Sequence, residues 1–315
     1  MSIRVGVQFA GWPLGPLEGQ RFFDFVDRVE ALGLDSLWFS DRLISSTPTL
    51  GSTAALATVA ARTRKLKFGS AVLVLPTRNV LEVAKEIATL DLLSGGRMLP
   101  AFGLGSEDER EYESAGIPKP QRAGRLDEAV PLLRRLWSED HVTHHGRYFH
   151  CSDVTLSPKP APTASGQGPP IWFGGRSAAA FRRVGRLGDG WLASFITPDE
   201  VREGVAAVKA AAVEVGRSLE EDHYGVIVTY RVAGSRAQAI EGLAPNLARF
   251  RPDVPPEDYC AFGSVDECIA VIRRFIDAGA SKFVMRPTCP PEELDEQLEV
   301  LAREVAPAVE RLPVS

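Results

Sequence analysis

The stretch Pro170–Phe195, PIWFGGRSAAAFRRVGRLGDGWLASF, contains the unit that decides the fold. A short apolar run is followed by two glycines and a serine, then by an Ala- and Arg-rich helical segment, and a second apolar run begins at Trp191. Apolar runs that alternate with helical segments are typical of parallel strands joined by crossover helices. The stretch therefore predicts one strand–helix–strand unit of a parallel sheet.

The corner of this unit, Gly174-Gly175-Arg176-Ser177, has features of an anion site. The glycines free the backbone from Cβ contacts, and Ser177 is a good N-cap for a helix that begins at Ala178. Exposed N–H groups at a helix N-terminus suit a phosphate. A tight strand-to-helix turn without a ligand has the same local pattern. From the corner alone, both interpretations stay open.

The same alternation of apolar runs and helical segments continues along the whole chain and predicts a (β/α)8 barrel rather than an open sheet. Eight apolar segments are expected as strands, at residues 4–9, 36–39, 66–75, 98–104, 170–173, 191–195, 224–232 and 282–285. Two amphipathic helices, expected over 21–32 and 268–278, each stop at a glycine, Gly33 and Gly279. Helix, glycine and strand in this order fit such a barrel.

One interval, Gly105–Pro169, interrupts this alternation, because the connection between the fourth and fifth expected strands is unusually long. It contains a helical pattern over 126–137, a His-rich piece and a Pro- and Gly-rich loop. Because connections of this length are usually functional, we expect an insertion over the mouth of the barrel. The expected organisation is a single domain, 1–315, with the insertion at about 105–169.

Composition narrows the function classes. The 315 residues are 44% hydrophobic without an apolar run near membrane-spanning length, and the start has no secretory pattern, so we expect a cytoplasmic protein without a membrane partner. A net charge of −5 with scattered basic residues argues against nucleic acid. The four cysteines lack Cys-x-x-Cys spacing, so neither disulfides nor a zinc knuckle is indicated.

The segment HVTHHGRYFH places four histidines, His141, His144, His145 and His150, close together. Neighbouring side chains of an edge strand point to opposite faces, so these histidines cannot all converge. The sequence also lacks a nucleophile elbow and a P-loop. We therefore predict no metal site and expect neither hydrolase nor nucleoside-triphosphate chemistry.

Catalytic residues of such barrels follow the strands, and two acids stand there. Asp41 follows the second strand, where it could bind a ligand or act in proton transfer, or simply cap a loop. Glu107 follows the fourth strand, in the acidic cluster SEDEREYE, which also looks like a solvated first helical turn. Both are candidate catalytic residues.

Several segments together resemble the luciferase-like flavin-dependent oxidoreductases, which include luciferase-type monooxygenases and dehydrogenases that use coenzyme F420. The resemblance spans nearly the whole chain. It rests on RVGVQF, EALGLDSLWFSDRL, KFGSAVLVLPTRNVLEVAKEIATLDLLSGGRMLPAFGLGSEDEREYESAGIP, RAGRLDEAVPLLRRLW, PPIWFGGRSAAAFRRVGRLGDGW and FGSVDECIAVIRRFIDAGASKFVMRP.

The resemblance implies a barrel with an insertion near its mouth and a reduced flavin or deazaflavin across the strand ends. It implies a non-prolyl cis peptide at Ala71–Val72 behind the ring, with small residues leaving room for it. The cofactor-binding residues that it implies are Asp41, Ser70, Ala71, Val72, Gly105, Gly174, Gly175, Arg176 and Ser177.

Asp41 matches the acid that in deazaflavin users often precedes a histidine, but Arg42 stands in the histidine's place. This departure leaves Asp41, Glu107 or a residue of the insertion as proton donor. We favour F420 as cofactor. The alternative is FMN with oxygen, supplied by a separate flavin reductase.

The leading hypothesis is hydride transfer between F420 and a small organic substrate. Expected pocket walls are Phe9, Trp12, Phe195 and Arg286, of which Arg286 could hold a substrate acid or pair with a carboxylate. The resemblance also implies a homodimer. Two rivals remain, a non-catalytic relative that has lost its cofactor and a barrel enzyme that acts on a phosphorylated metabolite without flavin.

Overall fold

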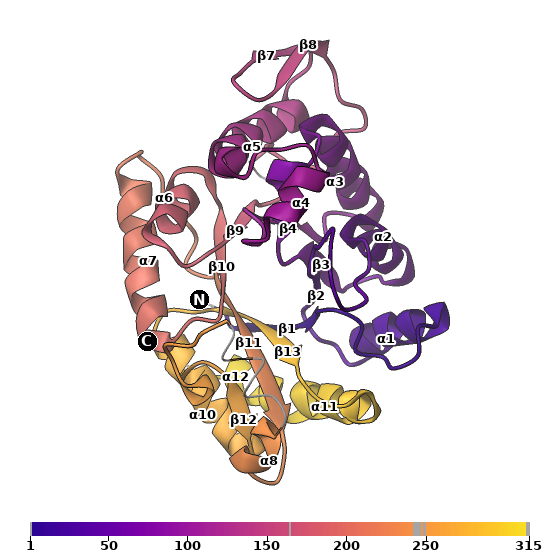
Figure 1. Cartoon of the computed structure of the whole chain (residues 1–315), viewed down its shortest axis with the longest axis vertical. Coiled ribbons are helices and arrows are strands. Elements are labelled where there is room, and N and C mark those ends of the chain that lie inside the picture. Colours follow the sequence, from indigo (N-terminus) through magenta and orange to yellow (C-terminus); the bar gives the residue numbers. More distant parts are fainter. Residues whose placement is uncertain (1, 164, 242–246, 248–249, 313–315) are drawn as a thin grey trace.

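The computed structural model describes residues 2–163, 165–241, 247 and 250–312, and its centre is a curled parallel sheet with helices around it (Figure 1). The strands of this sheet, in chain order, are β1 (Arg4–Phe9), β2 (Ser36–Phe39), β3 (Lys67–Ser70), β4 (Leu73–Val74), β5 (Met98–Leu99), β6 (Ala101–Gly103), β9 (Trp172–Gly174), β10 (Gly190–Ser194), β11 (Tyr224–Val232), β12 (Ala261–Gly263) and β13 (Lys282–Pro287).

The pairings close the sheet into a ring of eight strand positions. β3 and β4 are two halves of the third strand, and β5 and β6 are two halves of the fourth. β3 pairs with β5 and β4 with β6, while β6 continues through β9, β10, β11 and β13 to β1 and β2, which returns to β3. All of these pairings are parallel. The predicted (β/α)8 barrel is confirmed.

Two of the expected strands are interrupted. The segment expected as one strand over 66–75 breaks at Ala71 and Val72, and the next breaks at Pro100, which has no amide hydrogen to donate. β12 was not expected. It pairs with the end of β11, where Tyr230 lies opposite Ala261, because β11 is longer than its neighbours and leaves an edge there.

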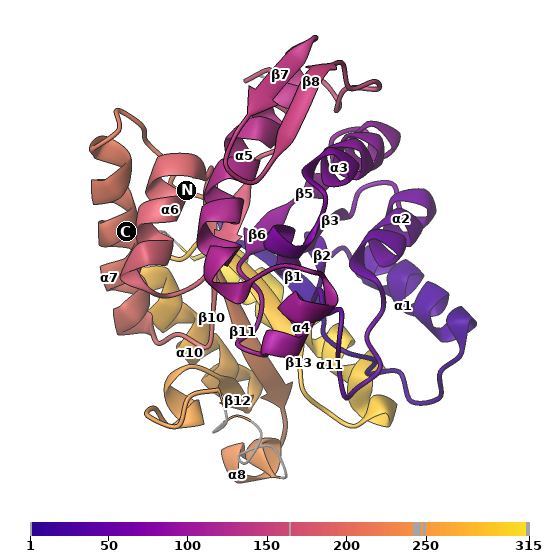
Figure 2. The ribbon, with the colours of Figure 1, turned by 45° about the horizontal axis from the view of Figure 1, so that its top comes forward.

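The helices surround the strands (Figure 2). Gly33, at φ +74°, and Gly279, at φ +103°, follow the ends of two helices, as the helix–glycine–strand pattern predicts. The helices are α1 (Gly19–Ala31), α2 (Ser52–Arg62), α3 (Val80–Ser94), α4 (Glu109–Ser114), α5 (Arg122–Ser138), α6 (Ala178–Leu187), α7 (Pro198–Val213), α8 (Arg236–Ile240), α10 (Val265–Asp277), α11 (Leu294–Val300) and α12 (Ala306–Glu310).

The interval between the fourth and fifth strands divides into two parts. α5 packs between α3 and α6, in the place of an ordinary barrel helix. The hairpin of β7 (Val142–His145) and β8 (His150–Val154) lies on the outer side of α5, where Glu128 accepts hydrogen bonds from the backbone N–H groups at its turn (Figure 2).

The hairpin corrects the expectation of an insertion that lies wholly over the mouth. Val142 and Phe149 are buried against the helices, and the guanidinium of Arg125 lies 4.8 Å from the ring of Phe149. Burial of these apolar side chains holds the hairpin beside α5. Within this interval, the residues that line the mouth cavity fall between 105 and 126.

A buried ion pair lies at the amino ends of the strands. Lys282, the first residue of β13, donates to Asp35 Oδ2 at 2.6 Å, and its ammonium lies 5.7 Å from the ring of Trp38. Burial raises the pKa of Asp35, but the charge and hydrogen bond of Lys282 outweigh it and hold this pKa below its usual value. Breaking such a pair leaves a charge without compensation.

We expect Lys282→Met to lower the free energy of unfolding by about 3 to 5 kcal/mol, because only Lys67, at 3.3 Å and near solvent, would still face Asp35. Urea denaturation measures the change. The double variant with Asp35→Leu removes both charges and is expected to recover most of the loss. A double variant as unstable as the single one would contradict this account.

Candidate functional site

A cavity of about 380 Å³ opens at the carboxyl ends of the strands, between the third to seventh strand positions and the first turns of α5 and α6. Seven of the predicted site residues line it, namely Ala71, Val72, Gly105, Glu107, Gly174, Gly175 and Ser177. Sequence reasoning missed several others, among them Arg122, Leu126, Arg183, Leu192, Ser194 and Ile227.

The glycine corner forms one end of this cavity. Ser177 Oγ accepts a hydrogen bond from the Ala180 N–H at 3.2 Å, which confirms the predicted N-cap of α6. Gly175 has φ +111°, and a Cβ there would stand 2.8 Å from the Cβ of Ala180. The indole of Trp191 donates to the carbonyl oxygen of Gly175 at 2.8 Å. The corner therefore needs glycine and presents a helix N-terminus to the cavity, as an anion site requires.

The floor of the cavity is formed by Val72. The cis peptide predicted between Ala71 and Val72 is present. A Cβ on Gly103 would lie 2.3 Å from Val72 Cγ2, and a Cβ on Gly174 would lie 2.8 Å from Val72 Cγ1. The two glycines thus leave the space into which Val72 packs. An apolar floor beside an anion corner fits a planar ring that carries a phosphate.

Ser70 lies behind this floor and does not line the cavity. It is buried, donates to the carbonyl oxygen of Ala101 at 2.8 Å, and accepts from the N–H of Ala101 at 3.1 Å. These two hydrogen bonds replace some of the backbone hydrogen bonds between the third and fourth strands, which are interrupted here. Ser70 therefore positions the floor.

Asp41 is buried beside the mouth, against a smaller cavity of about 180 Å³. Its Oδ1 accepts from Ser52 Oγ at 2.9 Å and from Arg78 Nη2 at 2.8 Å, and its Oδ2 accepts from the N–H of Val74 at 3.0 Å. Both oxygens already have partners, so the geometry supports a role in holding the ends of β2, β4 and α2 together. Its catalytic role stays a prediction.

Glu107 lies at the rim, with 77% of its side chain exposed. Arg122 at 2.6 Å and Lys119 at 2.9 Å flank it. Their hydrogen bonds, with that of Arg122 the stronger, hold the pKa of Glu107 below its usual value. At neutral pH this carboxylate is ionised and can accept a proton but has none to donate.

Glu111, in the cluster predicted as a solvated turn, is buried instead. Ser106 Oγ donates to its Oε2 at 2.5 Å. Its Oε1 has no hydrogen bond and lies 3.4 Å from Arg42 Nε. Arg42, the residue that replaces the expected histidine, thus faces a buried acid. The neighbouring Tyr112, an aromatic residue in an acidic run, was the signal that this turn packs inward.

Arg286 and Phe195 meet in another part of the mouth and do not line the main cavity. Arg286 Nε donates to Gln8 Oε1 at 2.6 Å, and its guanidinium lies 4.8 Å from the ring of Phe195. Within the described ranges no carboxylate forms an ion pair with Arg286, and burial lowers its pKa to about 10. A cation with free donors in such a place suits an anionic substrate group.

Phe9 is not a pocket wall, contrary to expectation. Its ring packs on Phe22 at 5.3 Å and Phe25 at 5.2 Å, between β1 and α1. Alternation along β1 explains the difference, because Gln8 points into the barrel and its neighbour must point outward. Trp12 packs edge-on against Phe9 at 6.1 Å and donates to the carbonyl oxygen of Pro16, so it too lies outside the cavity.

The side chain of Arg176 does not line the cavity with the rest of the corner. Its guanidinium donates to the carbonyl oxygens of Phe195 and Phe250. The rings of these two phenylalanines stack with centroids 4.5 Å apart, and Phe195 has φ +52°. Arg176 thus braces the segment after β10, and only its backbone belongs to the corner.

The four histidines of the hairpin do not converge. His144 contacts Glu128 on α5, His141 contacts Asp153, and the rings of His145 and His150 lie 6.3 Å apart. In the part of the chain that the structure describes, the one group with ligand atoms within 4.8 Å of one another is Glu220, Asp222 and His223, at the turn before β11. That turn is at the amino end of the barrel, opposite the mouth.

A parallel barrel with an apolar floor and a glycine-rich helix N-terminus at its mouth is typical of enzymes that bind a planar, phosphorylated cofactor. The model of the luciferase-like monooxygenase family matches residues 7–278. The chain belongs to this family and is a luciferase-like oxidoreductase. In the described residues, no helix has the length and apolarity needed to cross a membrane.

Relatives along the full chain have different named activities. An F420-dependent glucose-6-phosphate dehydrogenase of Amycolatopsis mediterranei is 25% identical over 98% of this chain and 99% of its own. The 4-hydroxyprotoasukamycin monooxygenase of Streptomyces nodosus is 27% identical over 94% and 89%. A solved F420-dependent secondary alcohol dehydrogenase with an F420–acetone adduct has the same fold, with TM-score 0.83 at 21% identity over 98% and 99%.

We expect Gly103→Ala to lower the free energy of unfolding by about 1 to 3 kcal/mol, because the new methyl group would overlap Val72. Thermal or urea unfolding measures it. Adding Val72→Ala should recover part of the loss. Gly19→Ala is the matched control, since nothing lies within 4 Å of a Cβ there. Equal effects at Gly103 and Gly19 would contradict the packing described here.

We expect Arg286→Met to leave the free energy of unfolding unchanged or to raise it by about 1 kcal/mol, because burying an unpaired guanidinium is costly. Arg251→Met is the comparison. Arg251 binds Glu200 at 2.9 Å and Asp253 at 3.0 Å, so its loss should cost about 2 kcal/mol. Urea denaturation measures the free energy of unfolding of both variants. An equal loss of stability in the two variants would assign Arg286 a structural role.

Proposed function

We propose that this protein transfers hydride between coenzyme F420 and a small organic substrate. The observation that carries the proposal is the cavity that joins the Val72 floor to the glycine corner, because its two ends match a ring and a phosphate. The preference for F420 over FMN is supported by the dehydrogenase relative that spans nearly the full chain. Ser40-Asp41 after β2 also supports it, as the sequence resemblance implies.

In this proposal the backbone N–H groups of Gly174, Gly175 and Ser177 hold the cofactor phosphate, and Ala71 and Val72 support the ring. Bound F420 supplies or accepts the hydride. Leu192 and Ile227, which line the cavity and are buried, keep water from the ring. Water exclusion strengthens the electrostatic interactions within such a site.

Three charged side chains around the mouth have complementary roles in the proposal. Arg286 holds an anionic group of the substrate, and Phe195 covers its guanidinium. Glu107, ionised beside Arg122, accepts the proton when an alcohol is oxidised. Asp41 keeps Arg78 and the Val74 N–H in place, so it acts by positioning the strand beside the floor.

The second candidate is an FMN-dependent monooxygenase that uses oxygen and a separate flavin reductase. Arg42, which faces Glu111 where deazaflavin users have a histidine, favours it. A relative named as a monooxygenase spans most of this chain. A barrel that lost its cofactor, or one acting on a phosphorylated metabolite without flavin, remains a weaker rival, because neither needs the Val72 floor. A homodimer is a proposal from the family resemblance, and a cytoplasmic location is a proposal from the composition of the sequence.

Fluorescence titration with F420 and FMN tests the proposal. We expect F420 to bind with a micromolar Kd and FMN to bind at least tenfold more weakly. The variant Ser177→Asp keeps a helix cap and adds a negative charge at the corner, so it should weaken F420 binding about tenfold, the effect of about 1.4 kcal/mol of repulsion. Ser264→Asp, at the N-cap of α10, is the matched control.

The outcomes separate the candidates. Preference for FMN would favour the monooxygenase, and binding of neither compound would overturn the cofactor assignment. If Ser177→Asp and Ser264→Asp bind F420 equally well, the phosphate does not lie at the corner.

A further inference from the structure

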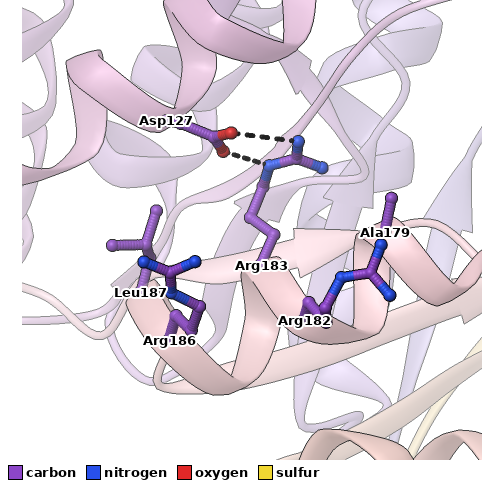
Figure 3. A pocket seen from close by; sticks show the side chains of 6 residues that line it. All are labelled: Asp127, Ala179, Arg182, Arg183, Arg186 and Leu187. Carbon is purple, nitrogen blue, oxygen red and sulfur yellow. Dashed lines mark hydrogen bonds and ion pairs between the residues drawn. The ribbon is translucent and has the colours of Figure 1, made fainter. Parts of the chain in front are cut away.

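Another cavity, of about 350 Å³, lies along α6 and is bordered by Asp127 of α5 (Figure 3). Its walls are Ala179, Arg182, Arg183, Arg186 and Leu187 of α6 and Asp127 of α5, and we call it the arginine groove. Ala179 and Arg183 also line the mouth cavity. The groove therefore begins where the mouth cavity ends, one turn beyond the glycine corner.

Two of the three arginines in the groove have no ionic partner among the residues that the structure describes. Arg183 is paired with Asp127 through Nε and Nη2, as Figure 3 shows. Arg182 and Arg186 are exposed, stand four residues apart on one face of α6, and form no ion pair with any residue that the structure describes. Like charges at this spacing repel each other, so an anion between them would be favourable.

Exposed arginines are often only a solvated helix face. The arrangement here differs because the unpaired guanidinium groups continue a cavity that already has an anion corner at its other end. Asp127, the one acid among the described residues that line the groove, is paired with Arg183. On a chain of net charge −5, this local excess of positive charge points to a negatively charged ligand that enters from the mouth.

We propose that the arginine groove binds the acidic tail of coenzyme F420. This inference rests on the proposed function. Beyond its phosphate, F420 carries a chain of glutamate residues, whereas FMN ends at the phosphate. With the phosphate at the glycine corner, the tail would leave past Ala179 and Arg183, and its carboxylates would meet Arg182 and Arg186.

The length of the groove agrees with a short tail. From Ala179 to Leu187 the helix axis rises roughly 12 Å. An extended chain covers about 3.3 to 3.6 Å per residue, and somewhat more for side-chain-linked glutamates, so two or three glutamates fit. Arginine recognises carboxylates with two parallel hydrogen bonds, which suits a tail of repeated carboxylates.

The test compares F420 with a deazaflavin that lacks its phosphate and tail. Wild-type protein and the double variant Arg182→Gln/Arg186→Gln are titrated, by fluorescence, with F420 bearing several glutamates and with the chromophore that lacks phosphate and tail. We expect the variant to bind F420 about tenfold more weakly, as loss of two exposed charge pairs implies, and to bind the tail-free chromophore as wild type does. The affinity of the double variant for F420 should also depend less on salt concentration than that of the wild type.

Arg273→Gln, which removes an exposed arginine from α10, is the matched control and should change neither affinity. If the double variant binds F420 as wild type does, or loses affinity for both compounds equally, the groove does not hold the tail, although the cofactor assignment stands. If wild-type protein binds no deazaflavin, the proposed function fails and this inference fails with it.

Discussion

The close packing of Val72 against Gly103 and Gly174 is the constraint on which the mouth of the barrel depends. The third and fourth strands are interrupted at the level where the cavity begins. The backbone hydrogen bonds between these two strands therefore do not hold the barrel closed there by themselves. Ser70 restores two hydrogen bonds to Ala101, and Val72 fills the space that the glycines leave. Since dense packing tolerates little added volume, a single side chain determines the shape of the floor.

Charge is distributed differently at the two ends of the barrel. At the amino end Lys282 and Asp35 neutralise each other. At the mouth, Arg286 lacks an acid partner within the described residues. Burying a charge without a partner costs stability, and natural proteins retain such groups mainly where function needs them. The contrast supports a structural role for Lys282 and the proposal that Arg286 binds an anionic substrate group.

The sequence was sufficient for the barrel, since the alternation of apolar runs and helices reports directly on a parallel sheet. The N-cap at Ser177 was also predictable, because it depends on neighbouring residues alone. The cis peptide at Ala71–Val72 came from the family resemblance. Phe9 was misplaced because position at a strand end does not tell which face of the sheet a side chain lies on. The neighbouring polar residue Gln8 was a signal, since neighbours along a strand point to opposite faces. The hairpin, the partners of Asp41 and the inward turn of Glu111 depend on contacts between distant segments, which local patterns do not contain.

Arg176 connects two parts of the mouth, the glycine corner and the segment after β10. It directly follows the glycine corner, and its guanidinium holds the carbonyl oxygen of Phe195, whose ring covers Arg286. A shift of the corner would therefore change the support of the Phe195 backbone, and any coupling between ligands at the two places would be equal in both directions. The shape of the glycine corner and the position of Phe195 against Arg286 are therefore linked through one side chain.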